Sequence, residues 1–151
     1  GLAEQVRDPW GGGCVTLSGP QNRDARAWYL DHDMPVFAYS SLARGFFSGR
    51  ISPDNLEQTR DLLDRACLTA YCHDVNVERL SRAMELAEER GMTVPQVALA
   101  YILQSPLDVF PLVGAANREE YAQNVAALDL CLTDGERAWL NLERDEKPSL
   151  L

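Results

Sequence analysis

Lysine is nearly absent from this sequence of 151 residues, in which thirteen of the fourteen basic residues are arginine and the only lysine is Lys147. Long apolar runs are also missing. None approaches the roughly 20 residues that cross a bilayer, so no membrane association is expected. The two histidines, His32 and His73, and the four cysteines do not show the paired spacing of a structural zinc site. We therefore expect no metal.

Positive charge is scarce overall, and the formal net charge is −9. Such a surface repels phosphate groups, which argues against nucleic acid and anionic lipid as partners. The composition, 46% hydrophobic and 25% charged, is typical of one globular domain, taken here as residues 1–151. Residues 1–10 carry charged and amide side chains without an apolar core, so they do not resemble a secretory signal. A cytoplasmic protein with reduced cysteines is expected.

Two segments have the composition of β-strands. Residues 36–40 follow Pro35, are apolar on both faces and predict a strand that is covered on both sides. Residues 109–113 predict a second strand, although Pro111 removes one ladder donor. Helical patterns separate the two, so the chain is expected to be α/β with two parallel strands and surrounding helices. Two parallel strands leave open edges, and the chain is therefore expected to be part of something larger.

Capping signals predict where the helices begin and end. Asn22 is the expected cap of a helix that runs to about Asp31, and Gly91 ends the pattern that begins after residues 71–74. The last residues, 147–151, resemble a disordered end. Further helix starts are expected at Ser52-Pro53 and at capping boxes over residues 93–96, 117–120 and 133–136.

Three stretches resemble the aldo-keto reductases: residues 34–50, residues 93–103, and residues 109–124 with the apolar segment that follows them. In family terms these are the seventh strand with its loop, a helix, and the eighth strand with the cofactor-phosphate loop. Ser41 stands where the family usually has Pro. The matches cover about residues 34 to 142 in the family's order. They imply the C-terminal portion of a (β/α)8 TIM barrel.

The resemblance also implies which chemistry is missing. Aldo-keto reductases pass hydride between NADPH and a carbonyl, using Tyr, Lys, Asp and His residues from the first strands of the barrel. Those strands lie upstream of this segment in the family. Neither Lys147 nor the two histidines fall at a matching position, so no catalytic residue is assigned here. The chain alone is expected to be inactive.

Twelve residues match family positions that hold the cofactor, and backbone N–H groups, small residues and a helix N-terminus suit phosphate binding there. The implied cofactor is NADP(H), with NAD(H) as the alternative: Arg118 favours a phosphate near this helix, whereas Glu119 and Glu120 oppose one. The twelve residues are Ser40, Ser41, Leu42, Arg44, Gly45, Gly114, Ala115, Ala116, Asn117, Arg118, Gln123 and Asn124.

Three hypotheses stay open at this point. The first is the cofactor-binding part of an NAD(P)H-dependent oxidoreductase, which acts on a small carbonyl or alcohol only within a complete barrel. The second is a non-catalytic partial barrel that self-associates through its open sheet edges or pairs with another chain. The third is an unrelated helical interaction domain. Adjacent parallel strands at residues 36–40 and 109–113 would exclude the third hypothesis.

Overall fold

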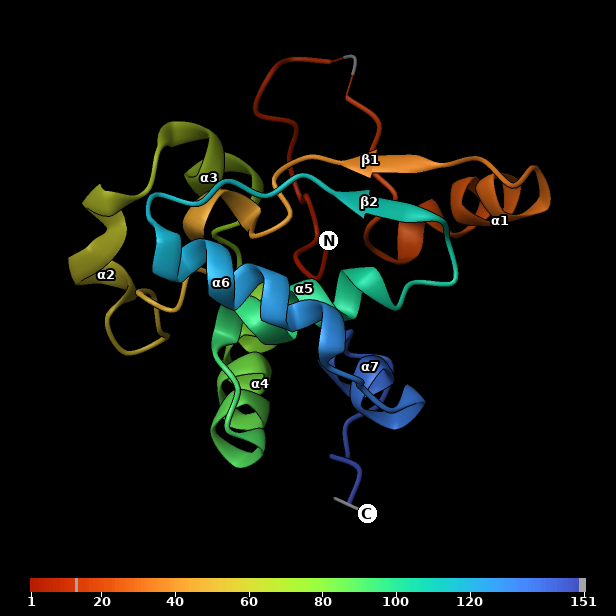
Figure 1. The fold of residues 1–151 in the computed structure, drawn as a ribbon. Coiled ribbons are helices and arrows are strands. Elements are labelled where there is room, and N and C mark those ends of the chain that lie inside the picture. Colours follow the sequence, from red (N-terminus) through yellow and green to blue (C-terminus); the bar gives the residue numbers. More distant parts are fainter. Residues whose placement is uncertain (13, 150–151) are drawn as a thin grey trace.

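The computed structural model describes residues 1–12 and 14–149, and its sheet consists of two parallel strands (Figure 1). Strand β1 (Val36–Ala38) pairs with β2 (Val109–Pro111) in the register Val36 to Val109 and Ala38 to Pro111. The prediction of adjacent parallel strands is confirmed, although each is shorter than expected. Gly13 and the last two residues of the expected disordered end lie outside the described residues.

The α-helices make up most of the remaining regular secondary structure. They are α1 (Arg23–Asp31), α2 (Leu56–Thr59), α3 (Arg65–Ala70), α4 (Asp74–Arg90), α5 (Val94–Leu103), α6 (Arg118–Ala126) and α7 (Asp134–Leu140). Short 3₁₀ turns occur at Pro20–Asn22, Ala43–Gly45, Arg60–Leu62 and Ala127–Asp129. The order of strands and helices is the one that the sequence predicts.

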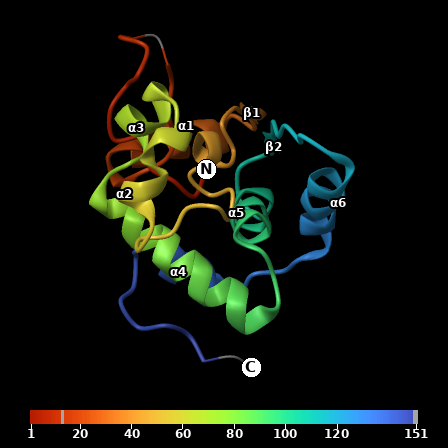
Figure 2. The ribbon, with the colours of Figure 1, turned by 90° about the vertical axis from the view of Figure 1, so that its left-hand side faces the viewer.

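The strand pair is covered on one side only, so the expectation of cover on both faces is wrong. Helix α5 packs against β2 and lies between α4 and α6 (Figure 2). On the other face Phe37 and Phe110 are 65% and 47% exposed and stack on each other with ring centroids 5.2 Å apart. The apolar composition of residues 36–40 therefore predicts a strand correctly. It does not predict that one face of the strand stays exposed within this chain.

The core is formed mainly by α3, α4, α5 and α7 together with the segment after β1. Phe46 and Phe47, from the segment after β1, are completely buried there and meet edge to face at 5.6 Å. Leu80 of α4 and Val97 of α5 belong to the same buried cluster. The expected capping box of α5 is confirmed, with Thr93 accepting from the Gln96 backbone N–H.

A buried amide joins the N-terminal segment to α4. Leu2 and Ala3 are buried, and the Asn76 side chain pairs with both backbone groups of Glu4, each at 2.8 Å. The same amide donates to the Tyr71 carbonyl at 2.9 Å. Because one buried side chain satisfies three backbone groups, the first residues of the chain are part of the fold.

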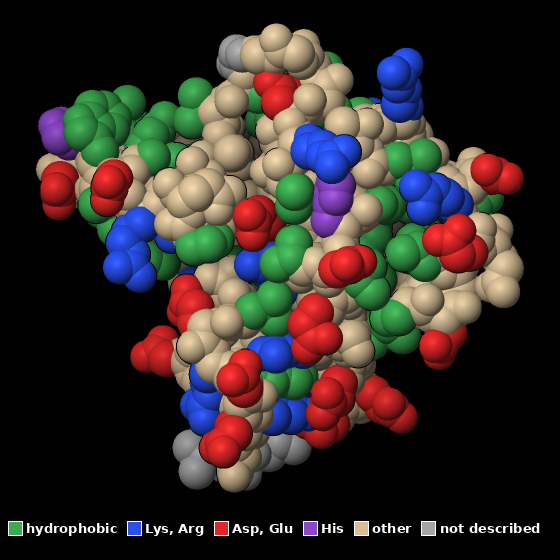
Figure 3. All heavy atoms as spheres, turned by 180° about the vertical axis from the view of Figure 1, so that it is seen from behind, with side chains coloured by type: hydrophobic (Ala, Val, Ile, Leu, Met, Phe, Trp, Pro, Cys, Tyr) green, Lys and Arg blue, Asp and Glu red, His purple; other side chains and the backbone are tan. Residues whose placement is uncertain are grey.

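The end of the chain is ordered further than its composition suggests. Lys147 Nζ pairs with Glu85 at 2.9 Å and with Glu89, and it lies 5.2 Å from the centre of the Trp139 ring. Figure 3 shows acidic and basic side chains interspersed over the lower part of the rear face. At Lys147 the structure therefore differs from the expectation of a disordered end.

Three expected helix starts differ in detail. Asn22 precedes α1, but its side chain donates to the Ser18 carbonyl and does not cap the helix. Ser52 and Asn55 bond each other in a turn, and α2 begins only at Leu56. The box at residues 117–120 is half formed, because the Glu120 carboxylate turns to another backbone N–H. Local side-chain bonds compete with capping in each case.

Gly91 gives the first testable prediction. It ends α4 in the left-handed conformation, with φ 62° and ψ 30°, and nothing lies within 4 Å of the Cβ that alanine would add. Gly91→Ala should therefore destabilise through backbone strain alone, by about 1 kcal/mol in urea unfolding. Gly91→Asn, which tolerates this conformation, should lose clearly less. Equal losses for the two variants would contradict the explanation.

Candidate functional site

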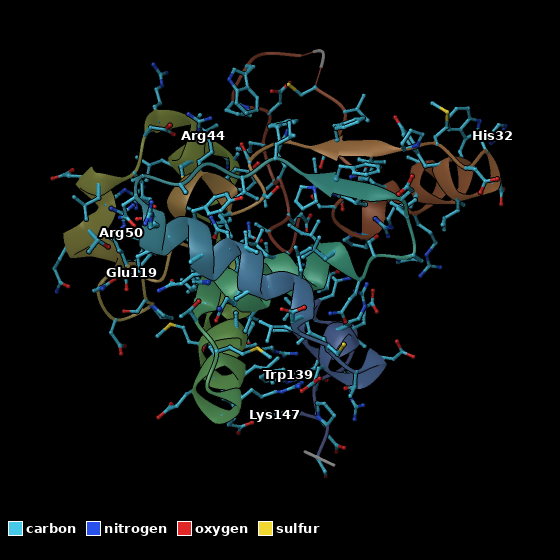
Figure 4. All side chains as sticks on the ribbon, viewed as in Figure 1. His32, Arg44, Arg50, Glu119, Trp139 and Lys147 are labelled. Atoms are coloured by element: carbon cyan, nitrogen blue, oxygen red, sulfur yellow. The ribbon has the colours of Figure 1, made fainter. Side chains whose placement is uncertain are left out.

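A cavity of about 700 Å³ opens at the carboxyl ends of the two strands. One wall is the segment after β1, residues 40–45, and the other is the segment after β2 with the first turns of α6. Figure 4 shows Arg50 and Glu119 beside the N-terminal end of α6, with Arg44 nearer to α3. The lining residues are Ser40, Ser41, Leu42, Arg44, Gly45, Ser48, Arg50, Asp64, Pro95, Leu112, Val113, Gly114, Asn117, Glu119, Glu120, Gln123 and Asn124.

The wall after β1 is a tightly wound loop. Ser40, Ala43 and Arg44 adopt positive φ angles of 52°, 50° and 54°, and Gly45 follows at 96°. The Ser41 hydroxyl donates to the Ala38 carbonyl at 2.9 Å, which closes the turn directly behind the strand. Positive φ is uncommon for residues other than glycine, and such positions concentrate at functional sites.

A thiol supports this loop from behind. Cys67 is buried, and its Sγ donates to the Ala43 carbonyl at 3.3 Å. The neighbouring Cys72 and burial raise the pKa of the Cys67 thiol. Cys67 therefore stays protonated and serves as a donor to the loop.

Arg44 is held in place by Asp64. Its Nε donates to both carboxylate oxygens of Asp64, at 2.9 and 3.1 Å, and its Nη2 contacts one of them. The hydrogen bond from Arg44 lowers the pKa of Asp64, with a further contribution from the backbone N–H of Cys67. Asp64 caps α3 through that N–H, so the loop and the helix are coupled by one carboxylate. The Arg44 charge is already paired inside the cavity.

The α6 wall is acidic. The Asn117 side chain accepts from the Glu120 N–H at 2.9 Å, and the Glu120 carboxylate accepts from the Ala116 N–H at 2.8 Å. Glu119 and Glu120 both line the cavity. Further along α6, the Gln123 carbonyl accepts from the Gln96 side chain at 3.4 Å, which links α6 to the start of α5.

The structure brings nine of the twelve predicted residues around this one cavity. The three that are not among its described lining residues are Ala115, Ala116 and Arg118. Sequence reasoning did not select Asp64 or Arg50, which also line it. Arg50 lies within the segment 34–50 that carried the resemblance, so the signal for it was present. Asp64 is brought in only by folding, because it lies twenty residues beyond Arg44 in the chain.

The remaining polar candidates lie elsewhere. His32 stacks on Trp28 with ring centroids 4.2 Å apart, and His73 contacts the Thr69 carbonyl through Nε2 at 2.7 Å. All four cysteines are free thiols. Within residues 1–12 and 14–149, no group of three His, Cys, Asp or Glu residues is arranged to hold a metal ion. No helix in the described part of the chain combines the length and apolar character needed to cross a membrane.

Comparison with known proteins gives one consistent family. The model of the aldo/keto reductase family matches residues 17–141. Norsolorinic acid reductase B of Dothistroma septosporum is 43% identical over 114 residues, and its Aspergillus parasiticus counterpart is 31% identical over the same length; each match covers 76% of this chain. A soybean (Glycine max) protein named "Probable aldo-keto reductase 1" is 32% identical over 99 residues, 66% of this chain. The matched segments span only 28 to 29% of these relatives. No solved structure matches the chain significantly.

Proposed function

Because the chain belongs to the aldo/keto reductase family, we propose that it is the cofactor-holding C-terminal part of an NAD(P)H-dependent oxidoreductase. In this proposal β1 and β2 are the seventh and eighth strands of a (β/α)8 barrel. The other strands would pair with their open edges. The substrate is a small carbonyl or alcohol, which reacts only in the complete barrel.

The shared cavity at the strand ends carries this proposal. Ligand sites of parallel α/β proteins lie at the carboxyl ends of the strands, where successive loops meet. The volume of about 700 Å³ lies within the range of ligand pockets. Loop 40–45 and the N-terminal end of α6 are far apart in sequence, yet they face the same space. The family membership and this cavity together support dinucleotide binding better than they support any other function.

The chain's own residues would bind and orient the ligand. A bound nicotinamide dinucleotide supplies or accepts hydride at its nicotinamide ring. The backbone groups of loop 40–45 and the guanidinium of Arg50 would contact the phosphates, because both face the cavity. His32, His73 and Lys147 are not among its described lining residues. We therefore assign no proton donor to this chain.

A second role, as an assembly module, is favoured by one observation. Phe37 and Phe110 form an exposed stacked pair on the face of the sheet away from α5. Such a face suits association with another part of a barrel, or with another chain. The third hypothesis, an unrelated helical domain, is wrong, because the strands are parallel neighbours and the family model matches.

Thermal melts with nicotinamide dinucleotides test the proposed function. Millimolar NADH or NADPH should raise the melting temperature of the chain, because a ligand of the native state stabilises it by mass action. Gly114→Leu should abolish the shift. Gly114 lines the cavity, and nothing lies within 4 Å of its added Cβ, so the larger side chain would occupy ligand space without a clash.

Gly91→Asn is the matched control, because it alters a glycine at the far end of α4 and should leave the ligand-induced shift intact. A melt that neither cofactor shifts would overturn dinucleotide binding by this chain. Concentration-dependent self-association without any cofactor effect would support the assembly module instead.

A further inference from the structure

The charge around the cavity is unevenly distributed. Two arginines, Arg44 and Arg50, face three carboxylates, Asp64, Glu119 and Glu120, which leaves one excess negative charge. Arg44 is bound by Asp64. Arg50 forms no ion pair with any described residue. The described lining therefore offers a ligand phosphate one unpaired cation, Arg50.

Side chains of this chain already occupy some of the backbone N–H donors at the start of α6. A helix N-terminus attracts phosphate because its first N–H groups are unpaired and carry partial positive charge. Here the Glu120 carboxylate occupies the Ala116 N–H, and the Asn117 side chain occupies the Glu120 N–H. The chain's own side chains thus take up one N–H just before the helix, at Ala116, and one in its first turn, at Glu120, and the group on Ala116 is a carboxylate.

Arg118 does not compensate for these carboxylates. It is exposed, and it is absent from the lining within the described residues. Its neighbours Glu119 and Glu120 do line the cavity. The sequence left the choice between the two cofactors open because Arg118 and the two glutamates oppose each other. The structure places the glutamates, and not the arginine, on the ligand side.

From this arrangement, and resting on the proposed function, we infer that the cavity selects NAD(H) over NADP(H) and that Glu120 is the main specificity-determining residue. NADP(H) carries one additional phosphate, a dianion, into a cavity whose net charge is already negative. NAD(H) carries a ribose hydroxyl in its place, which can donate a hydrogen bond to a carboxylate. Repulsion of the phosphate and acceptance of the hydroxyl act in the same direction.

Titration of the full chain with NADH and NADPH, followed by isothermal calorimetry, tests this inference. NADH should bind at least about tenfold more tightly, a ratio that corresponds to about 1.4 kcal/mol. Glu120→Gln keeps an oxygen that can accept from the Ala116 N–H but removes the charge. It should narrow the ratio to about threefold or less, mainly by strengthening NADPH binding. Glu57→Gln, at a carboxylate on α2 outside the cavity lining, is the charge-matched control and should leave the ratio unchanged.

The possible outcomes test the cofactor selectivity, the role of Glu120 and the proposed function separately. Equal or tighter binding of NADPH by the unaltered chain overturns the selectivity while the proposed function stands. An unchanged ratio in Glu120→Gln overturns the role of Glu120. Failure of both cofactors to bind overturns the proposed function and this inference with it. Because the readout is a ratio of two affinities, a general loss of stability in the variant does not imitate the expected result.

Discussion

Replacing Phe46 with alanine lowers the free energy of unfolding by about 3–5 kcal/mol, the range typical of a buried aromatic side chain that leaves a cavity behind. Phe46 is completely buried and packs edge to face against Phe47 within the core cluster. It follows Gly45 directly, so its loss should also loosen the cavity loop. Urea unfolding followed by circular dichroism measures the free-energy change.

Phe37 is the matched control for Phe46, because the same side chain is 65% exposed on the open face of the sheet. Phe37→Ala should lose only the contact with Phe110, worth about 1 kcal/mol. Comparable losses at the two positions would show that the open face is covered in solution. That result would favour self-association, and its dependence on protein concentration would identify it.

Asn76→Ala should be the most damaging polar substitution. It leaves the N–H and C=O of Glu4 without a partner, and the Tyr71 carbonyl keeps only its bond from the His73 N–H. A buried polar group that loses its partner costs about 1–3 kcal/mol, so a total of about 3–4 kcal/mol is expected once water has partly compensated. Faster hydrogen exchange over residues 1–6 should accompany the loss, because the N-terminal segment is released from α4.

Asn22 provides the comparison for Asn76. Its side chain makes a single bond, to the Ser18 carbonyl, at a partly exposed position. Asn22→Ala should therefore cost below about 1 kcal/mol. If both variants lost the same small amount, the Asn76 network would not hold the N-terminal segment in place.

Local chemistry explains why much of the fold could be predicted. Thr93 and Gln96, and likewise Thr133 and Glu136, form capping boxes in the structure. Gly91 ends α4 in the left-handed conformation that favours glycine. Each signal involves residues within one helical turn, so it depends little on the rest of the chain.

Long-range geometry explains what could not be predicted. Apolar composition cannot tell whether Phe37 meets another part of the same chain, and it remains exposed here. In the cavity, Asp64 reaches Arg44 only through the packing of α3 behind the loop. The choice of Glu120 between the Asn117 and Ala116 N–H groups is a local competition that sequence spacing does not decide.

The left-handed backbone of loop 40–45 has a consequence for the thermodynamics of any ligand in the cavity. Ser40, Ala43 and Arg44 each hold a conformation that costs an ordinary residue about 1 kcal/mol. The Ser41 hydroxyl, the Cys67 thiol and the Asp64 carboxylate hold the loop or its arginine in that shape through bonds within the chain. The entropic cost of ordering it therefore falls on folding and not on association. A preorganised loop of this kind favours a rigid, slowly dissociating complex over one that forms by induced fit.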